Sequence, residues 1–112
     1  MNTILVENAR VGYYDLMLEG QRIGGVYLAS TPLCGLYLGD FHVHQAFQGL
    51  GYGKELMAHA IAWAKEHEYQ RMTLVVRIDN VRAIKLYKSF GFTIREWTES
   101  LIYMDLIFDP AI

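Results

Sequence analysis

One stretch decides the fold, Val43-His44-Gln45-Ala46-Phe47-Gln48-Gly49-Leu50-Gly51-Tyr52-Gly53-Lys54, and it lies between a strand-like apolar run and a long amphipathic pattern. Glycines at this point let several backbone N–H groups converge on one anion without intruding side chains. The helix that follows adds the positive end of its dipole. The stretch therefore predicts a turn that binds phosphate.

Two well-known phosphate loops fit this turn poorly. A Walker A loop needs Ser or Thr after its lysine, but Glu55 follows Gly53-Lys54. A dinucleotide-binding loop has the spacing Gly-x-Gly-x-x-Gly, whereas Gly49, Gly51 and Gly53 are evenly spaced. A helix start that uses glycine only for a tight turn is the remaining alternative. The turn by itself leaves its ligand open.

A second segment, residues 76–92, narrows the choice. It reads as a strand end, an N-cap at Asn80, a short amphipathic helix and a glycine stop at Gly91. Together the two segments resemble the GNAT superfamily of acyl-CoA-dependent N-acyltransferases. The pyrophosphate loop of that family is written (Gln/Arg)-x-x-Gly-x-(Gly/Ala), and it is matched by Gln48, Gly51 and Gly53.

The later signature of the GNAT superfamily is Asn-x-x-Ala-x-x-Leu-Tyr-x-x-x-Gly-Phe. It is matched by Asn80, Ala83, Leu86, Tyr87, Gly91 and Phe92. The two motifs stand in the family's order and at its usual separation, and the resemblance covers residues 12–108. It implies an acyl-CoA-dependent N-acetyltransferase that is a short member of the superfamily.

Composition indicates a small single domain over residues 1–112. The net charge of -2, without a stripe of Lys and Arg, argues against nucleic acid as the main partner. One cysteine, Cys34, excludes an internal disulfide and is compatible with a reducing compartment. No basic leader and no apolar run long enough to span a membrane stands out. We therefore expect a cytoplasmic protein with no membrane partner.

The hydrophobic pattern predicts an α/β fold with a mixed sheet. The predicted strands are residues 3–6, 13–19, 22–30, 36–43, 72–78, 92–99 and 101–108, and the predicted helices are residues 53–68 and 81–89. The resemblance implies a GNAT-like, mostly antiparallel sheet with two main helices and splayed central strands.

Family members usually carry two helices between their first and second strands, and these helices shape much of the acceptor pocket. Only twelve residues precede Tyr13, where the first predicted hairpin strand begins. That is too short for two helices with turns, because a helix rises about 1.5 Å per residue. We expect an open acceptor side that is completed by a second copy of the chain or by the substrate. This favours an amine on a macromolecule, or a homodimer, over an enclosed small-molecule pocket.

The resemblance also implies which residues hold the acyl-CoA. They are Phe41, Val43, Gln48, Gly49, Leu50, Gly51, Tyr52, Gly53, Lys54, Asn80 and Tyr87. In the family, the backbone of the strand before the glycine turn pairs with the pantetheine arm and serves as an oxyanion donor. On the second predicted helix, Arg82, Lys85 and Lys88 either approach the adenosine phosphate or form a solvated face.

Tyr87 is the candidate acid that protonates the leaving thiolate, since it occupies the position of the family's tyrosine. A core aromatic side chain at helical spacing is the alternative for Tyr87. Asn80 is either an N-cap alone or an N-cap that also approaches the cofactor arm.

The general base is less clear from the sequence. The positions at which many relatives place Glu or His hold Tyr37 and Gly39. Asp40 and His42 are the candidates that remain, beside a base formed by water and beside plain solvated strand residues. They lie on the opposite face from Phe41 unless a β-bulge redirects them. The pair His42 and His44 lacks a third ligand at a persuasive spacing, so we expect no metal.

The predicted reaction is direct transfer of an acetyl group from acetyl-CoA to a primary amine of a protein or a small molecule. A lysine-like amine of pKa about 10.4 is deprotonated near pH 7 at a cost of about 4.6 kcal/mol, so the site needs a base or a desolvated pocket. The alternative is a non-catalytic CoA-binding regulatory or interaction module.

Overall fold

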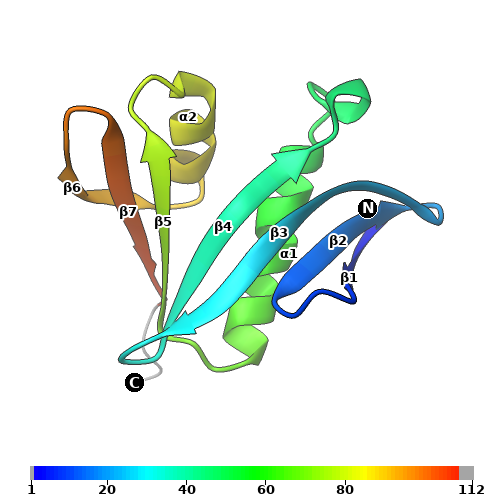
Figure 1. Ribbon diagram of the computed structural model, residues 1–112, viewed down its shortest axis with the longest axis horizontal. Helices are drawn as coiled ribbons and strands as arrows, with labels where there is room; N and C mark the ends of the chain where they lie inside the picture. The colour runs from blue at the N-terminus through cyan, green and yellow to red at the C-terminus, as the bar shows by residue number, and fades with distance from the viewer. Residues whose placement is uncertain (1, 109–112) are drawn as a thin grey trace.

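The chain folds into one seven-stranded sheet with two α-helices, and the computed structural model describes residues 2–108 (Figure 1). The elements are β1 (Thr3–Glu7), β2 (Tyr13–Leu18), β3 (Gln21–Thr31), β4 (Gly35–Val43), a 3-10 turn (Gln45–Phe47), α1 (Tyr52–Glu66), β5 (Arg71–Arg77), α2 (Val81–Ser89), β6 (Thr93–Trp97) and β7 (Leu101–Ile107). The strand order is β1-β2-β3-β4-β5-β7-β6, and β4 with β5 is the parallel pair. The predicted fold class is confirmed.

Several predicted boundaries shift by one or two residues. The first helix begins at Tyr52 and ends at Glu66, because Gly51 is its N-cap and His67 already leaves helical geometry as the C-cap. The strand predicted to end at residue 99 ends at Trp97, where the chain turns toward β7. The 3-10 turn before the glycines was not predicted. The prediction of a single domain over residues 1–112 extends beyond the described residues.

The core lies between the sheet and α1, which passes behind β3 and β4 in Figure 1. The helical spacing predicts an apolar face of Leu56, Met57, Ala60, Ile61 and Ala64, and all of these are buried except Ile61, which is half-buried against the core. They meet sheet residues such as Leu16, Ile23 and Met72, which are fully buried. Each buried aliphatic side chain of this size contributes about 1.5–3 kcal/mol from removal from water. This packing fixes α1, and with it the glycine turn that precedes α1.

The two central strands separate along their length, as the resemblance implied. The pairing of β4 with β5 is limited to Gly35–Tyr37 with Arg71–Thr73, although β4 continues to Val43. Figure 1 shows β4 and β5 diverging from that point toward the glycine turn and α2. The β4 edge beyond Tyr37 therefore has no strand partner on the β5 side among the described residues.

A β-bulge in β4 accompanies this separation. Tyr27 pairs with Gly39 and Gly25 pairs with His42, so β4 has one more residue than β3 over the same interval. Asp40 and Phe41 have no register partner there, and Asp40 has a φ of 47°. A non-glycine residue in the left-handed region marks a local distortion that the surroundings must maintain.

The connection between β1 and β2 is residues 8–12, and no helix lies in it. The expectation that this connection is too short for two helices is therefore met. No helix within residues 2–108 is long and apolar enough to cross a membrane.

Candidate functional site

A groove of about 820 Å3 opens where the end of β4, the glycine turn and α2 converge. It is lined by Phe41, His42, Val43, Gln48, Gly49, Gly51, Gly53, Lys54, Asn80, Arg82, Ala83, Lys85, Leu86 and Ser89. The groove brings together the two motifs, which lie about 30 residues apart in the sequence but follow the neighbouring parallel strands β4 and β5 at the same edge of the sheet.

The glycine turn needs glycine for backbone reasons. Gly49 and Gly51 have φ values of 78° and 91°, and a Cβ at either position would meet nothing within 4 Å. The left-handed φ, and not crowding within the protein, therefore disfavours other residues there. Gly51 is also the N-cap of α1, so the first N–H groups of α1, which have no partner within the helix, lie beside the groove that Gly51 and Gly53 line. This arrangement suits an anion.

Gln48 ties the glycine turn to β4. Its side-chain Nε2 donates a hydrogen bond of 2.8 Å to the carbonyl of Val43. That contact holds the turn against the end of the strand that forms the groove wall. Gln48 therefore shapes the groove, besides lining it.

Three lysine or arginine side chains line the groove, Lys54 on α1 and Arg82 and Lys85 on α2. They give the groove a cationic rim that suits phosphate groups. Lys88 is not among the lining residues. Leu50, which is 67% exposed, and Tyr52, which packs against Phe47 at 6.2 Å between ring centroids, lie outside the lining as well.

Tyr87 lies at the inner end of the space between β4 and β5. A second cavity of about 240 Å3 is lined by Tyr87, Asp40, Phe41 and Asn80 together with residues of β4 and β5. The Tyr87 ring is 7% exposed and packs on Phe41 at 5.9 Å and on Phe92 at 6.0 Å between centroids. It is thus both a core aromatic and a cavity residue, so the two alternatives for it are compatible.

The environment of Tyr87 favours its protonated form. Burial raises the pKa of the Tyr87 hydroxyl above its ordinary value of 10.0. No residue within 2–108 forms a hydrogen bond with this hydroxyl. The group therefore carries a proton at neutral pH and is free to donate it into the cavity.

Asn80 caps α2, as predicted. Its Oδ1 accepts a hydrogen bond of 3.2 Å from the N–H of Ala83, while the residue lines both cavities. The Oδ1 atom is used by the cap, which leaves the Nδ2 group as the side-chain donor of Asn80.

The bulge places the two candidate bases differently. The Asp40 side chain is 61% exposed and its residue lines the smaller cavity, whereas His42 lines the larger groove. His42 Nδ1 lies 2.8 Å from the backbone carbonyl of Asp40, and its Nε2 lies 3.3 Å from Nη2 of Arg22. Both ring nitrogens of His42 are therefore engaged within the chain, whereas the Asp40 carboxylate is exposed beside the smaller cavity.

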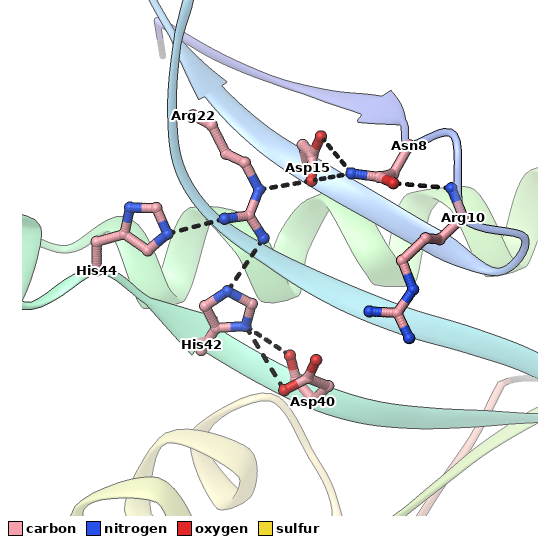
Figure 2. A network of polar contacts seen from close by, with 7 residues as sticks. All are labelled: Asn8, Arg10, Asp15, Arg22, Asp40, His42 and His44. Atoms are coloured by element: carbon pink, nitrogen blue, oxygen red, sulfur yellow. Dashed lines mark hydrogen bonds and ion pairs between the residues drawn. The ribbon is translucent and has the colours of Figure 1, made fainter.

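A polar network that the sequence did not predict holds His42 (Figure 2). Arg22 donates to Asp15 Oδ1 at 2.7 Å, to His44 Nε2 at 3.0 Å and to His42 Nε2 at 3.3 Å. Asn8 donates to both carboxylate oxygens of Asp15 at 3.1 and 3.0 Å.

The charge state of Asp15 follows from these contacts. Burial raises the pKa of Asp15, but the hydrogen bonds from Arg22 and Asn8 outweigh burial and lower the pKa below its ordinary value of 3.8. The alternation of Asp15 and Arg22 with buried Leu16 and Ile23 was the available sequence signal for a polar face. Their meeting with His42 depends on strand register, which the sequence did not provide. Within residues 2–108 no cluster of three or more His, Cys, Asp or Glu residues forms that could hold a metal ion.

The comparisons with known proteins agree with this geometry. A family model described as the acetyltransferase (GNAT) family matches residues 3–92. The aminoglycoside N(6')-acetyltransferase type 1 of Stenotrophomonas maltophilia is 26% identical over 101 residues, which are 90% of this chain and 61% of that protein. N-alpha-acetyltransferase 40 of Saccharomyces cerevisiae is 34% identical over 83 residues, which are 68% of this chain and 27% of that protein. The chain thus spans less than two thirds of the length of either relative.

Among solved structures, the ribosomal-protein-S18-alanine N-acetyltransferase of Escherichia coli superposes with a TM-score of 0.79. It is 24% identical, and the match covers 94% of this chain and 74% of that chain. This likeness shows the fold. Since the family model spans most of the chain and both motif segments converge on one groove, the chain belongs to the acetyltransferase (GNAT) family.

Proposed function

We propose that this protein is an N-acetyltransferase that moves an acetyl group from acetyl-CoA to a primary amine. The observation that carries the proposal is that a groove beside a helix start suited to an anion and a smaller cavity beside a buried, protonated tyrosine share two lining residues, Phe41 and Asn80. Acetyl-CoA supplies the activated acetyl group as a thioester. Residues of this chain bind acetyl-CoA, orient it, and donate and accept the protons of the reaction.

The groove residues fit such a co-substrate. The turn from Gln48 to Lys54 and the rim formed with Arg82 and Lys85 match the charge of a pyrophosphate and a further phosphate. The edge of β4 around Phe41 and Val43 has no strand partner on the β5 side within residues 2–108 and offers backbone groups to an amide-containing arm, apart from the Val43 carbonyl, which accepts from Gln48. The same backbone offers an N–H donor for developing oxyanion charge.

Tyr87 is the proposed acid. A thiolate with a pKa near 8.5, by analogy with cysteine, leaves more readily when it gains a proton at neutral pH. The Tyr87 hydroxyl carries that proton because burial raises its pKa. Asp40 is the proposed acceptor of the proton from the amine, directly or through water, since its carboxylate is exposed beside the cavity that Tyr87 lines.

The acceptor side supports an accessible amine. The short connection at residues 8–12 leaves this side without the two helices that family members usually carry there. The two relatives are named as an aminoglycoside N(6')-acetyltransferase and as an N-alpha-acetyltransferase, so both names point to acetylation at nitrogen. For this chain we propose a primary amine exposed on a macromolecule as the first class to test. A cytoplasmic location and a homodimer stay predictions from the sequence.

An acetyl-transfer assay with an amine panel tests the proposal. The release of free CoA thiol is followed with a peptide bearing a free N-terminus, a peptide with an internal lysine and an aminoglycoside, each against a blank without amine. Faster thiol release with at least one amine, together with an acetylated product by mass spectrometry, supports the enzyme. Tight CoA binding with no amine-dependent release would instead identify a CoA-binding module.

A further inference from the structure

A chain of hydrogen bonds links the start of the β1–β2 connection to the bulge in β4 (Figure 2). It begins with Asn8, passes through the Asp15 carboxylate to the Arg22 guanidinium, and continues to His42. The His42 ring ends the chain at the backbone carbonyl of Asp40. The network lies on the side of the sheet opposite α1, since α1 passes behind the strands that carry it in Figure 2.

The proton positions in this chain follow from the donors. A guanidinium has only N–H donors, so Nε2 of His42 and Nε2 of His44 must both accept from Arg22. The neutral His42 ring then carries its proton on Nδ1 and donates it to the Asp40 carbonyl at 2.8 Å. Arg22 thus selects one tautomer of His42 and holds the ring in one orientation.

The bulge depends on that ring. Asp40 and Phe41 have no register partner on β3, and Asp40 adopts a φ of 47° that is unfavourable for a residue with a Cβ. The Nδ1–H of His42 satisfies the carbonyl at this distorted point. Surrounding contacts must maintain such a conformation. The hydrogen bonds from Asp15 on β2 through Arg22 on β3 to His42 are one set of contacts that connects the bulge to neighbouring strands.

The bulge in turn sets the groove wall. Phe41 follows Asp40 directly, lines both cavities and packs its ring edge-on against Tyr87 at 5.9 Å. A shift of the bulge therefore moves Phe41 relative to the proposed acid. Small displacements of this kind lower turnover strongly because catalysis depends on near-ideal alignment of reacting groups.

We propose that Arg22 is a positioning residue for acyl transfer, which acts by fixing the Nδ1–H tautomer of His42 and, through it, the β4 bulge that aligns Phe41 with Tyr87. The expected effect of Arg22 on acetyl transfer rests on the proposed function. The effect of Arg22 on the tautomer of His42 does not. The planar fork of Arg22 is essential, because one group must reach a carboxylate and two imidazoles.

The variant Arg22→Lys tests this proposal, with Arg95→Lys as the matched control. Lysine keeps the charge beside Asp15, so the fold is retained, but a single ammonium cannot replace three directed contacts. Arg95 is a suitable control because it also pairs with a carboxylate, Asp105, at 2.9 Å, and because its exposed fraction of 46% is close to the 43% of Arg22.

Three measurements are made on each protein: the ¹⁵N shifts of the His42 ring, kcat with an active amine, and the Kd of CoA. For Arg22→Lys we expect a loss of the Nδ1–H preference, a fall in kcat of at least about tenfold, and a CoA Kd within about threefold of wild type, since Arg22 is not among the residues that line the groove. For Arg95→Lys we expect no change.

The outcomes separate the two proposals. An unchanged His42 tautomer, an unchanged kcat in Arg22→Lys, or an equal fall in Arg95→Lys would each overturn the positioning role. A wild-type protein that acetylates none of the amines would overturn the proposed function and the catalytic part of this inference. In that case the ¹⁵N shifts still decide whether Arg22 selects the tautomer of His42. If Arg22→Lys is too unstable to study, Asn8→Ala breaks the same chain at its outer end and should move the His42 tautomer in the same direction.

Discussion

Replacement of Tyr87 by Phe removes one oxygen atom from the centre of the proposed site. The ring remains packed against Phe41 and Phe92, and no described residue forms a hydrogen bond with the lost hydroxyl. We therefore expect the free energy of unfolding to change by about 1 kcal/mol or less. The variant should fold, and its kinetics should report on the proton alone.

The expected loss of rate follows from the role of the hydroxyl as a general acid. Proton transfer by a positioned acid contributes about 10²–10⁴-fold in rate. Burial raises the pKa of Tyr87 above its ordinary value of 10.0, so the hydroxyl keeps its proton across neutral pH but is a weaker acid than a thiol of pKa near 8.5. We therefore expect kcat to fall about 10- to 100-fold, which corresponds to about 1.4–2.7 kcal/mol. The difference between wild type and variant should persist past pH 8.5 and shrink only as the pH approaches the pKa of Tyr87, where wild type loses the proton as well.

The assay is the initial rate of thiol release with a saturating amine, with the Kd of CoA measured by calorimetry. Tyr103→Phe is the matched control, since Tyr103 lies half-buried on β7 and outside both cavities. Equal kcat values for wild type and Tyr87→Phe at pH 7 would refute the role of Tyr87. A fall in kcat matched by an equal loss of CoA affinity would refute it as well.

Three further predictions concern the turn, the core and the network. Gly51→Glu should raise the Kd of CoA at least about tenfold in calorimetry, because a φ of 91° disfavours a side chain and the new charge faces the phosphates; an unchanged Kd would remove the turn from the site. Leu16→Ala should lower the free energy of unfolding in urea by about 2–5 kcal/mol, because Leu16 is fully buried, and a loss below about 1 kcal/mol would contradict the described core. Asp15→Asn should lower the free energy of unfolding by about 1 kcal/mol at pH 7. The folded-state pKa of Asp15 is lower than its unfolded value, so the ionised carboxylate stabilises the fold above about pH 4, and this stabilisation is lost as the pH falls through the folded pKa. A difference in unfolding free energy between wild type and Asp15→Asn that is the same at pH 7 and pH 3 would contradict this role of Asp15.

Much of the fold was predictable because its signals are local. The alternation along β2 and β3 and the helical spacing of Leu56, Met57 and Ala60 indicate the elements directly, and the core confirms them. The sequence predicts Asn80 as the N-cap of the second helix, and in the structure Asn80 Oδ1 accepts a hydrogen bond from the N–H of Ala83. The separation of β4 from β5 followed only from the resemblance, since it depends on where two distant segments stop pairing.

The site was predicted less completely, for the same physical reason. The glycines and Asn80 carry local signals, whereas the contact of Arg22 with His42 crosses two strands whose register has an irregularity at Gly25 and Tyr27. A one-residue bulge reverses which side chains of a strand face the groove. Nothing in the residue types around Asp40 predicts a bulge at that position. The structure therefore adds where Asp40 and His42 lie, while the identity of the base stays a prediction.

The central claim is that the groove between β4, the glycine turn and α2 binds acetyl-CoA. A ¹H–¹⁵N correlation spectrum of the protein titrated with CoA tests it most directly, because every backbone amide of the site reports separately. We expect saturable shifts at Phe41, Val43, Gly49, Gly51 and Asn80, and their loss in Gly51→Glu. Saturating CoA that leaves these amides unmoved, or that shifts a different face of the sheet, would contradict it.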